Sequence, residues 1–273
     1  MYIGGTDSKG LHHLVSEVLD NSMDEAVAGF ATQIDIEFTS EDEISIADNG
    51  RGIPIDFHPK FPDKTALEVI FCTLHAGGKF SDKNYTTSGG LHGVGISVVN
   101  ALSEKLTVEV TKNKVCYSQS FSKGIPLDKI KKVGKSKIKS GTKIIFSPDK
   151  AVFSSNKFFN AKTIYELAKS KAYLFSGVTI DWKAPNIRDS DLNQMPMAER
   201  FHFENGLMDL VNSNTADKFN ITNDYFMGDA DFKEKFDPKE KGSINWCACF
   251  NTYNPVINSF CNTIPTSEGG THQ

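Results

Sequence analysis

The sequence contains no run of eighteen apolar residues, and this excludes a membrane-spanning helix. Residues 1–5 have neither the basic start nor the apolar run of a signal peptide. The five cysteines form no CxxC pair and no series of zinc ligands, which indicates a reducing, cytoplasmic location. The net charge of -4 argues against a dominant nucleic-acid surface, because phosphates require clustered lysine and arginine. It leaves room for a local basic patch.

What the chain does have is the composition of a folded globular protein, with 39% hydrophobic and 23% charged residues in 273. A chain of this length can bury a large core without disulfides or metal ions. After Arg200 the alternation of apolar and polar residues changes and a polar, Asp- and Lys-rich stretch follows. We therefore expect a domain boundary near residue 205, with one domain over 1–204 and a second over 205–273.

Periodicity predicts the main elements. Apolar residues recur every three to four positions in some segments and alternate with polar residues in others. Strands joined by hairpins pair antiparallel, and the helices between them must cover one face of the sheet, so the fold class is α+β. We expect helices over 9–29, 66–75, 94–102, 161–175 and 207–211, and strands over 33–38, 43–47, 106–110, 115–121, 142–146, 178–182 and 244–250.

The first helix carries a polar stripe beside its apolar face. Glu17, Asn21 and Asp24 are spaced i, i+4 and i+7, so their side chains share one side of the helix. Carboxylate and carboxamide oxygens suit Mg²⁺, which takes few protein ligands besides phosphates and waters. A carboxylate at this place can also orient an attacking water as a general base. Taken by itself, the stripe is better explained as a solvated helix face.

A carboxylate stands where the second strand of the hairpin runs into a glycine-rich turn. Asp48 is followed by Gly50 and Gly52, and glycine lets a planar ligand come close to the backbone. The Asp48 carboxylate can accept a hydrogen bond from the exocyclic amine of a base, and Arg51 can pair with Glu25 at the edge. The alternative is an ordinary Asn-Gly turn with a local aspartate cap.

A glycine-rich loop over 88–95 precedes the apolar helix expected from residue 94. Without side chains, its N–H groups can point at an anion, and the helix dipole favours negative charge there. No Gly-Lys-Ser/Thr follows, so this is not a Walker A loop, and the GxxGxG spacing differs from the dinucleotide fingerprint. Lys79 and Tyr85, slightly upstream, can reach a phosphate or can be exposed loop residues. The alternative is a mobile surface loop.

Segments 17–26, 48–54 and 89–95, taken in this order, resemble the three motifs of the GHKL ATPases, the superfamily of DNA gyrase, heat-shock chaperones, sensor histidine kinases and MutL. Each motif is weak alone, but the three at this spacing are highly specific. The resemblance implies a two-layer α/β sandwich with a mostly antiparallel sheet, followed by the start of a ribosomal S5-like transducer domain.

Within the superfamily the sequence resembles the B subunits of bacterial type II topoisomerases over essentially its whole length. Two segments are more similar to topoisomerase IV than to gyrase, which stays the alternative; a non-topoisomerase nucleotide-gated clamp is the more distant one. The segments that carry the resemblance to the B subunits are 1–4, 74–80, 93–103 and 268–272, and those that favour topoisomerase IV are 58–62 and 169–175.

The resemblance implies ATP and Mg²⁺ as ligands, with a role for each matching residue. Glu17 would activate the attacking water, and Asn21 would bind the Mg²⁺ that bridges the phosphates. Asp48, with Thr142 and a water beside it, would accept from the adenine amine. The adenine site would be lined by Gly52, Ile53 and Pro54 with the Glu25–Arg51 pair at its edge, and the triphosphate would be held by Lys79, Tyr85, Leu91, His92, Gly93, Val94 and Gly95.

The resemblance also implies partners: the topoisomerase A subunit, duplex DNA, and a second B subunit once ATP is bound. Relatives carry an N-terminal arm upstream of segment 1–4 and a phosphate-binding lysine downstream of residue 273. We therefore expect the chain to bind ATP, to hydrolyse it poorly and to be mainly monomeric. Aminocoumarin-type inhibitors are expected at the rim of the ATP site, where Ser118 stands in place of an arginine found in many relatives.

Overall fold

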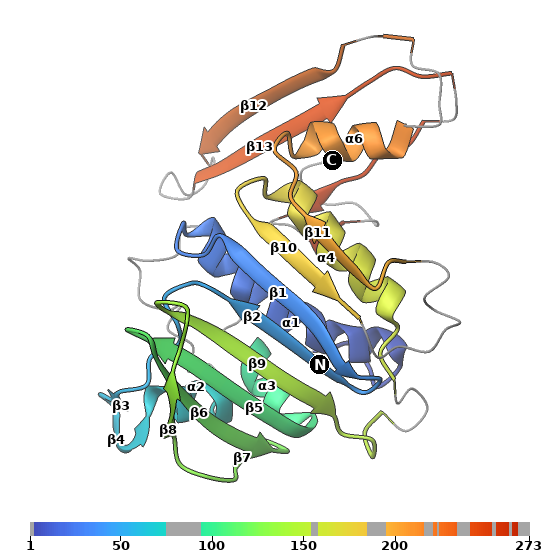
Figure 1. The fold of residues 1–273 in the computed structure, drawn as a ribbon. Helices are drawn as coiled ribbons and strands as arrows, with labels where there is room; N and C mark the ends of the chain where they lie inside the picture. The colour runs from blue at the N-terminus through green and yellow to red at the C-terminus, as the bar shows by residue number, and fades with distance from the viewer. Residues whose placement is uncertain are drawn as a thin grey trace.

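The computed structural model describes residues 3–74, 94–153, 158–184, 195–215, 221–222, 224–233, 241–252, 255–261 and 264–266. Within these residues the main feature is a nine-stranded sheet of order β11-β10-β1-β2-β9-β5-β6-β7, with β8 paired to β6. Helices α1 to α4 lie against one face of this sheet (Figure 1). The observed class is therefore α+β, with two layers, as the sequence predicts.

The helices are α1 (Ser8–Val27), α2 (Ala66–Cys72), α3 (Gly95–Ala101), α4 (Ala161–Leu174) and α6 (Leu207–Thr215). The strands of the large sheet are β1 (Gln33–Ser40), β2 (Glu43–Asp48), β5 (Ser103–Lys112), β6 (Val115–Ser122), β7 (Ile125–Pro126), β8 (Lys131–Lys135), β9 (Gly141–Pro148), β10 (Thr179–Lys183) and β11 (Ala198–Phe201). Two-stranded sheets are formed by β3 (Phe57–His58) with β4 (Phe61–Thr65), β12 (Phe226–Lys233) with β13 (Lys241–Ala248), and β14 (Phe260–Cys261) with β15 (Ile264–Pro265).

Helix α1 begins where Asp7 caps it, because the Asp7 side chain accepts a hydrogen bond from the Gly10 N–H at 3.0 Å. It ends before Gly29, whose φ of 77° suits glycine. The apolar side of α1 is buried in the core that the helices and the sheet share, while Glu17 and Asn21 stay half-buried. The helix thus holds its polar stripe at the border of the core.

Strand register places the second motif beside the first. β1 alternates as expected, with Ile34, Ile36 and Phe38 buried. β2 pairs antiparallel with both β1 and β9, and in the second pairing Asp48 lies opposite Thr142. The strand that carries the carboxylate is therefore central in the sheet, close to α1.

The structure adds to the predicted elements in ways that periodicity does not show. Strands β1 and β10 pair parallel, an exception to the antiparallel rule of the sheet. Strand β13 begins at Lys241 and ends at Ala248, whereas the sequence predicts a strand over 244–250. Seven short strands and the eight-residue β12 are also unpredicted; the short ones are β3, β4, β7, β8, β11, β14 and β15.

The part of the chain after residue 205 forms smaller units. Helix α6 packs against α4 and β13, and the β12–β13 ribbon extends beyond it (Figure 1). In the described ranges no helix has the length and hydropathy needed to cross a membrane.

Candidate functional site

Asp48 is a buried carboxylate at the end of β2, with 7% of its surface exposed. One oxygen, Oδ1, accepts from the Gly50 N–H at 2.9 Å, and Oδ2 accepts from the Ser22 hydroxyl of α1 at 3.3 Å. Burial raises the pKa of Asp48 to about 6, and the negative charge of Glu25 contributes, against the opposing hydrogen bonds. The two hydrogen bonds therefore hold the carboxylate in one orientation, but they offset only part of the cost of burying its negative charge.

The turn after Asp48 leaves no space for a side chain at Gly50 or Gly52. Gly52 has a φ of 74°, and a Cβ there would lie 3.0 Å from the carbonyl oxygens of Thr111 and Gly141. A Cβ at Gly50 would lie 2.9 Å from Oδ1 of Asp48. Glycine is thus needed at both positions, and the backbone itself forms this wall of the site.

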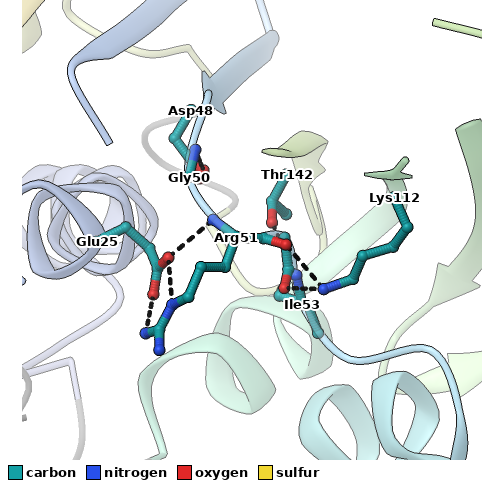
Figure 2. A network of polar contacts seen from close by, with 8 residues as sticks. Glu25, Asp48, Gly50, Arg51, Ile53, Lys112 and Thr142 are labelled. Atoms are coloured by element: carbon teal, nitrogen blue, oxygen red, sulfur yellow. Dashed lines mark hydrogen bonds and ion pairs between the residues drawn. The ribbon is translucent and has the colours of Figure 1, made fainter. Parts of the chain in front are cut away.

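An ion pair ties the turn to α1 (Figure 2). The Arg51 guanidinium donates through Nη2 to Oε1 of Glu25 at 2.7 Å and through Nε to Oε2 at 3.1 Å, and the Arg51 N–H also donates to Oε2. The guanidinium lies over the ring of Phe30, 3.7 Å from its centroid. This bidentate ion pair between Arg51 and Glu25 fixes the edge of the site more firmly than a single hydrogen bond would.

Two further side chains hold the turn from the sheet side (Figure 2). Lys112 donates to the carbonyl oxygens of Arg51 at 2.8 Å and Gly52 at 2.7 Å, and burial lowers the pKa of this ammonium. The Ile53 N–H donates to the Thr142 hydroxyl at 3.1 Å. The half-buried Ile53 side chain packs against the core, and the turn is rigid on both sides.

The polar stripe of α1 meets the third motif at the start of α3. A Cβ at Gly95 would collide with Oε2 of Glu17, so the glycine permits this close approach. Oε1 of Glu17 pairs with Nε2 of His13 at 3.1 Å, and this hydrogen bond raises the pKa of the imidazole. Asn21 donates from its side chain to the backbone carbonyl of Glu17 at 2.8 Å. That bond orients the Asn21 carboxamide.

The described parts of the three motifs therefore lie together. α1 contacts the Asp48 turn through Ser22 and Glu25, and it contacts α3 at Gly95. Val94 is buried directly before α3, and Pro54 is exposed at the end of the turn. Five predicted site residues lie outside the described residues: Lys79, Tyr85, Leu91, His92 and Gly93.

The structure adds three residues to the site that are not among those predicted from the sequence: His13, Ser22 and Lys112. His13 stands one helical turn before Glu17, so the i, i+4 spacing was an available signal. Ser22 and Lys112 are positioned by tertiary structure, and no local pattern marks them. Among the described residues no group of three or more His, Cys, Asp or Glu side chains could hold a metal ion by itself.

Comparison with known proteins agrees with this geometry. Residues 6–152 match the family model of histidine kinase-, DNA gyrase B- and HSP90-like ATPases, and residues 206–273 match that of DNA gyrase B. The whole chain aligns with the B subunit of DNA topoisomerase 4 from Rickettsia felis at 52% identity and with that from Bartonella bacilliformis at 48%. The B subunit of DNA gyrase from a Synechocystis species is 38% identical.

The chain spans 40%, 39% and 24% of the length of these three relatives, respectively. A crystal structure of the 43K ATPase domain of Thermus thermophilus gyrase B, in complex with an aminocoumarin, superimposes with a TM-score of 0.79 at 32% identity. That match covers all of this chain and 66% of the gyrase chain. The chain thus belongs to the histidine kinase-, DNA gyrase B- and HSP90-like ATPases, and within them it is most similar to B subunits of type II topoisomerases, with topoisomerase 4 ahead of gyrase among these relatives.

Proposed function

We propose that the chain is the ATP-binding and ATP-hydrolysing region of a type II DNA topoisomerase B subunit of the topoisomerase IV kind. The observation that carries this proposal is the meeting of the three motifs: Glu17 on α1, the Asp48 turn, and Gly95 at the start of α3. Phosphoryl transfer depends on positioning and on stabilising charge. The three motifs would supply what this requires: a carboxylate at Glu17, a fixed hydrogen-bond acceptor at Asp48, and backbone N–H groups at the start of α3.

The base would be recognised at the Asp48 turn. Asp48 is held by Ser22 and Gly50 so that its carboxylate accepts from the exocyclic amine of adenine. Thr142, opposite Asp48 in the sheet, supplies a second polar group. Gly52, Ile53 and Pro54 would line the ring, with the Glu25–Arg51 pair at its edge.

Hydrolysis would depend on Glu17. Its carboxylate pairs with His13 and is confined by the backbone of Gly95, so its orientation is set before substrate binds. In this position it can take the proton of the attacking water as general base. Asn21, whose amide nitrogen is used by the Glu17 carbonyl, keeps an oxygen that would bind Mg²⁺. When bound, Mg²⁺ supplies charge neutralisation of the phosphates and needs few protein ligands.

The phosphates would be bound by the third motif. Helix α3 begins at Gly95, directly after Val94, and its first N–H groups are free for an anion by helix geometry. The backbone of Leu91, His92 and Gly93, with the side chains of Lys79 and Tyr85, would complete this part of the site. Their role rests on the motif and stays a prediction.

In the whole enzyme, ATP binding would bring two B subunits together and hydrolysis would reset them, which drives passage of one DNA duplex through another held with the A subunits. The identities of 52% and 48% to topoisomerase 4 subunits, against 38% to a gyrase subunit, favour topoisomerase IV. Gyrase is the second candidate, and the two are separated by assay: decatenation without supercoiling by the full enzyme supports topoisomerase IV.

The division into domains 1–204 and 205–273 belongs to the same proposal. It is supported by the two family models, which match 6–152 and 206–273, and by the core, whose buried apolar side chains in the described residues end at Phe201. The second segment would be the start of a transducer domain. Aminocoumarin-type inhibitors would bind at the rim of the ATP site, as proposed from Ser118, and the similar gyrase B domain was crystallised in complex with an aminocoumarin.

The test replaces the proposed base. Glu17→Gln should bind a non-hydrolysable Mg²⁺-ATP analogue with nearly unchanged affinity by calorimetry, because the side chain keeps its size. ATP turnover in a full-length B subunit that carries the change should fall at least roughly 100-fold, the scale of a lost general base. Glu37→Gln, on β1 away from the motifs, is the control. Near-normal turnover in Glu17→Gln would remove Glu17 from this role.

A further inference from the structure

The segment that follows β7 is strongly basic although the chain as a whole is acidic. From residue 129 to residue 148 there is no aspartate or glutamate, whereas the chain has a net charge of -4. Seven lysines occur in the fifteen residues from 129 to 143. They are Lys129, Lys131, Lys132, Lys135, Lys137, Lys139 and Lys143.

Strand β8 presents three of these lysines along the edge of the large sheet, beside β6 (Figure 1). Lys132 and Lys135 lie opposite Tyr117 and Val115, and Lys131 lies opposite Ser118. Neighbouring positions of a strand point to opposite faces, so the edge carries positive charge on both sides. All three lysines are exposed.

The loop after β8 extends this edge. Its backbone packs on the turn between β5 and β6: the Lys114 N–H donates to the Lys139 carbonyl at 3.0 Å, and the Ser136 N–H donates to the Lys114 carbonyl at 2.8 Å. Lys114, Lys137 and Lys139 are exposed, and they join the strand lysines in one surface. We call this surface, formed by Lys114 and Lys129–Lys139, the basic edge.

Little of this charge is neutralised within the described part of the chain. Lys131 pairs with Asp128 at 2.8 Å, and both side chains are solvent-accessible, so the pair is weak. Among the described residues the other lysines of the basic edge form no ion pair. Lysines on an edge strand keep that strand from pairing with another chain. This protection explains the lysines of β8 but not those of the loop and the turn.

We propose that the basic edge binds the phosphate backbone of duplex DNA without reading its sequence. Lysines act as point charges that suit phosphates, whereas base-specific contacts in the major groove commonly use the arginine fork, which residues 112–148 lack. Single strands are bound on exposed aromatic rings, and residues 122–145 contain none. A strand of five residues is roughly 13 Å long, a length of duplex that carries about eight phosphate charges.

The choice of duplex DNA as the polyanion rests on the proposed function. The basic edge lies close to the proposed nucleotide site, because Lys139 and Arg51 line the same hollow of about 480 Å³. DNA on the basic edge would therefore lie beside the adenine end of the nucleotide site. For this reason Lys139 is left unchanged in the test.

The test measures binding of the 273-residue chain to a fluorescein-labelled duplex of about 20 base pairs by anisotropy, without nucleotide, across a salt series. The variant is Lys132→Ala, Lys135→Ala and Lys137→Ala together. The control is Lys60→Ala, Lys64→Ala and Lys105→Ala, three exposed lysines elsewhere, which gives the same net charge. We expect the first triple variant to bind at least about ten-fold more weakly and to lose about 2 to 3 from the slope of log K against log salt. The control should differ little from wild type.

Three outcomes would overturn the proposal: no binding of duplex by the wild type at low salt, equal losses in the two triple variants, or tighter binding of single-stranded RNA or anionic vesicles than of duplex. Lys137→Glu, a single change in the exposed loop, repeats the comparison with the least risk to folding. Affinity for an ATP analogue is measured on the same samples. If the analogue binds and DNA does not, only the basic edge is refuted, and if neither binds, the proposed function fails as well.

Discussion

At the scale of single residues, burial of the Asp48 carboxylate lowers the free energy of unfolding of the nucleotide-free protein. The carboxylate is buried, and its pKa is raised from 3.8 to about 6. Between these two pH values the folded protein binds more protons at Asp48 than the unfolded chain does. The free energy of unfolding therefore falls as pH rises through this window and stays lowered above it. Under the proposed function, this cost in stability accompanies the use of Asp48 as the acceptor for adenine.

Asp48→Asn should separate stability from binding. Removal of the buried charge should raise the free energy of unfolding of the nucleotide-free protein by about 3 kcal/mol at neutral pH and should abolish its decline between about pH 4 and pH 6. Affinity for an ATP analogue should fall, since a pure acceptor becomes a group that must be oriented. Calorimetry and urea unfolding at several pH values measure both.

Asp181→Asn is the matched control for that change. The Asp181 carboxylate pairs with Arg200 at 2.7 Å, which lowers the pKa of this aspartate. The same substitution there should bring no gain in stability and no change in nucleotide affinity. Unchanged ATP affinity in Asp48→Asn would instead show that adenine is not recognised at this turn.

Individual site residues were predictable from sequence only where chemistry and spacing coincide. Glu17 and Asn21 share a helical face, and Asp48 precedes two glycines, so each position is visible in a local pattern. The contribution of Lys112 is different, because its ammonium reaches the carbonyls of Arg51 and Gly52 across a sequence separation of about sixty residues. No local pattern contains that pairing.

At the scale of elements, the close contact between α1 and α3 depends on the glycine at position 95, which has no side chain to meet Glu17. Gly95→Ala would push the Glu17 carboxylate aside, because the new methyl group meets the far end of that flexible side chain. Alanine is the better helix former, so the melting temperature should not fall. Turnover should drop roughly 10- to 100-fold from misplacement alone.

Gly134→Ala is the matched control for Gly95→Ala, since a Cβ there meets nothing within 4 Å. Its turnover and melting temperature should both equal those of the wild type. If Gly95→Ala lost stability and turnover together, its effect would be structural and the claim about Glu17 would be weakened.

A buried ion pair joins α4 to α1. Nζ of Lys171, only 1% exposed, lies 2.6 Å from Oδ1 of Asp20, whose other oxygen, Oδ2, accepts from Ser16. Lys171→Met should cost about 3 to 5 kcal/mol of unfolding free energy, because it leaves a buried carboxylate without its counter-ion. Adding Asp20→Asn should restore part of the loss in urea unfolding.

Lys169→Met, on the same helix and half-buried over the ring of Tyr165, controls for loss of a lysine and should cost less than about 1 kcal/mol. A loss in Lys171→Met as small as in this control would mean that the pair contributes nothing to joining the two helices.

The elements that the sequence predicts are those with an apolar period. Helix α1 and strands β1, β2, β5 and β9 bury alternate or helically spaced side chains, and their predicted ranges differ from the observed bounds by a few residues. Strand β8 has the sequence KKVGK, which lacks such a period. It is a strand because its backbone pairs with β6, and a rule based on burial cannot detect a polar edge strand.

At the scale of the whole molecule, charge and burial are distributed unevenly. The net charge of -4 conceals the basic edge, a local patch of the kind that this net charge leaves room for. Burial shows a similar contrast between the two ends of the chain. The buried apolar side chains of the described residues all lie between Leu11 and Phe201, whereas Phe226, Trp246 and Phe250 are each about half exposed.

This contrast predicts that residues 1–204 fold and bind nucleotide without the rest of the chain. Every described residue of the proposed site lies between residues 13 and 142, and among the residues past 204 whose exposure the structure describes, only Gly206 and Thr215 are buried. The truncated chain loses the packing of α6 on α4, so its melting temperature should fall by a few degrees. Its affinity for a Mg²⁺-ATP analogue should stay within about three-fold, since binding depends on the intact site. Calorimetry on both chains measures this, and a loss of binding in a chain with an intact circular dichroism spectrum would place part of the nucleotide site after residue 204.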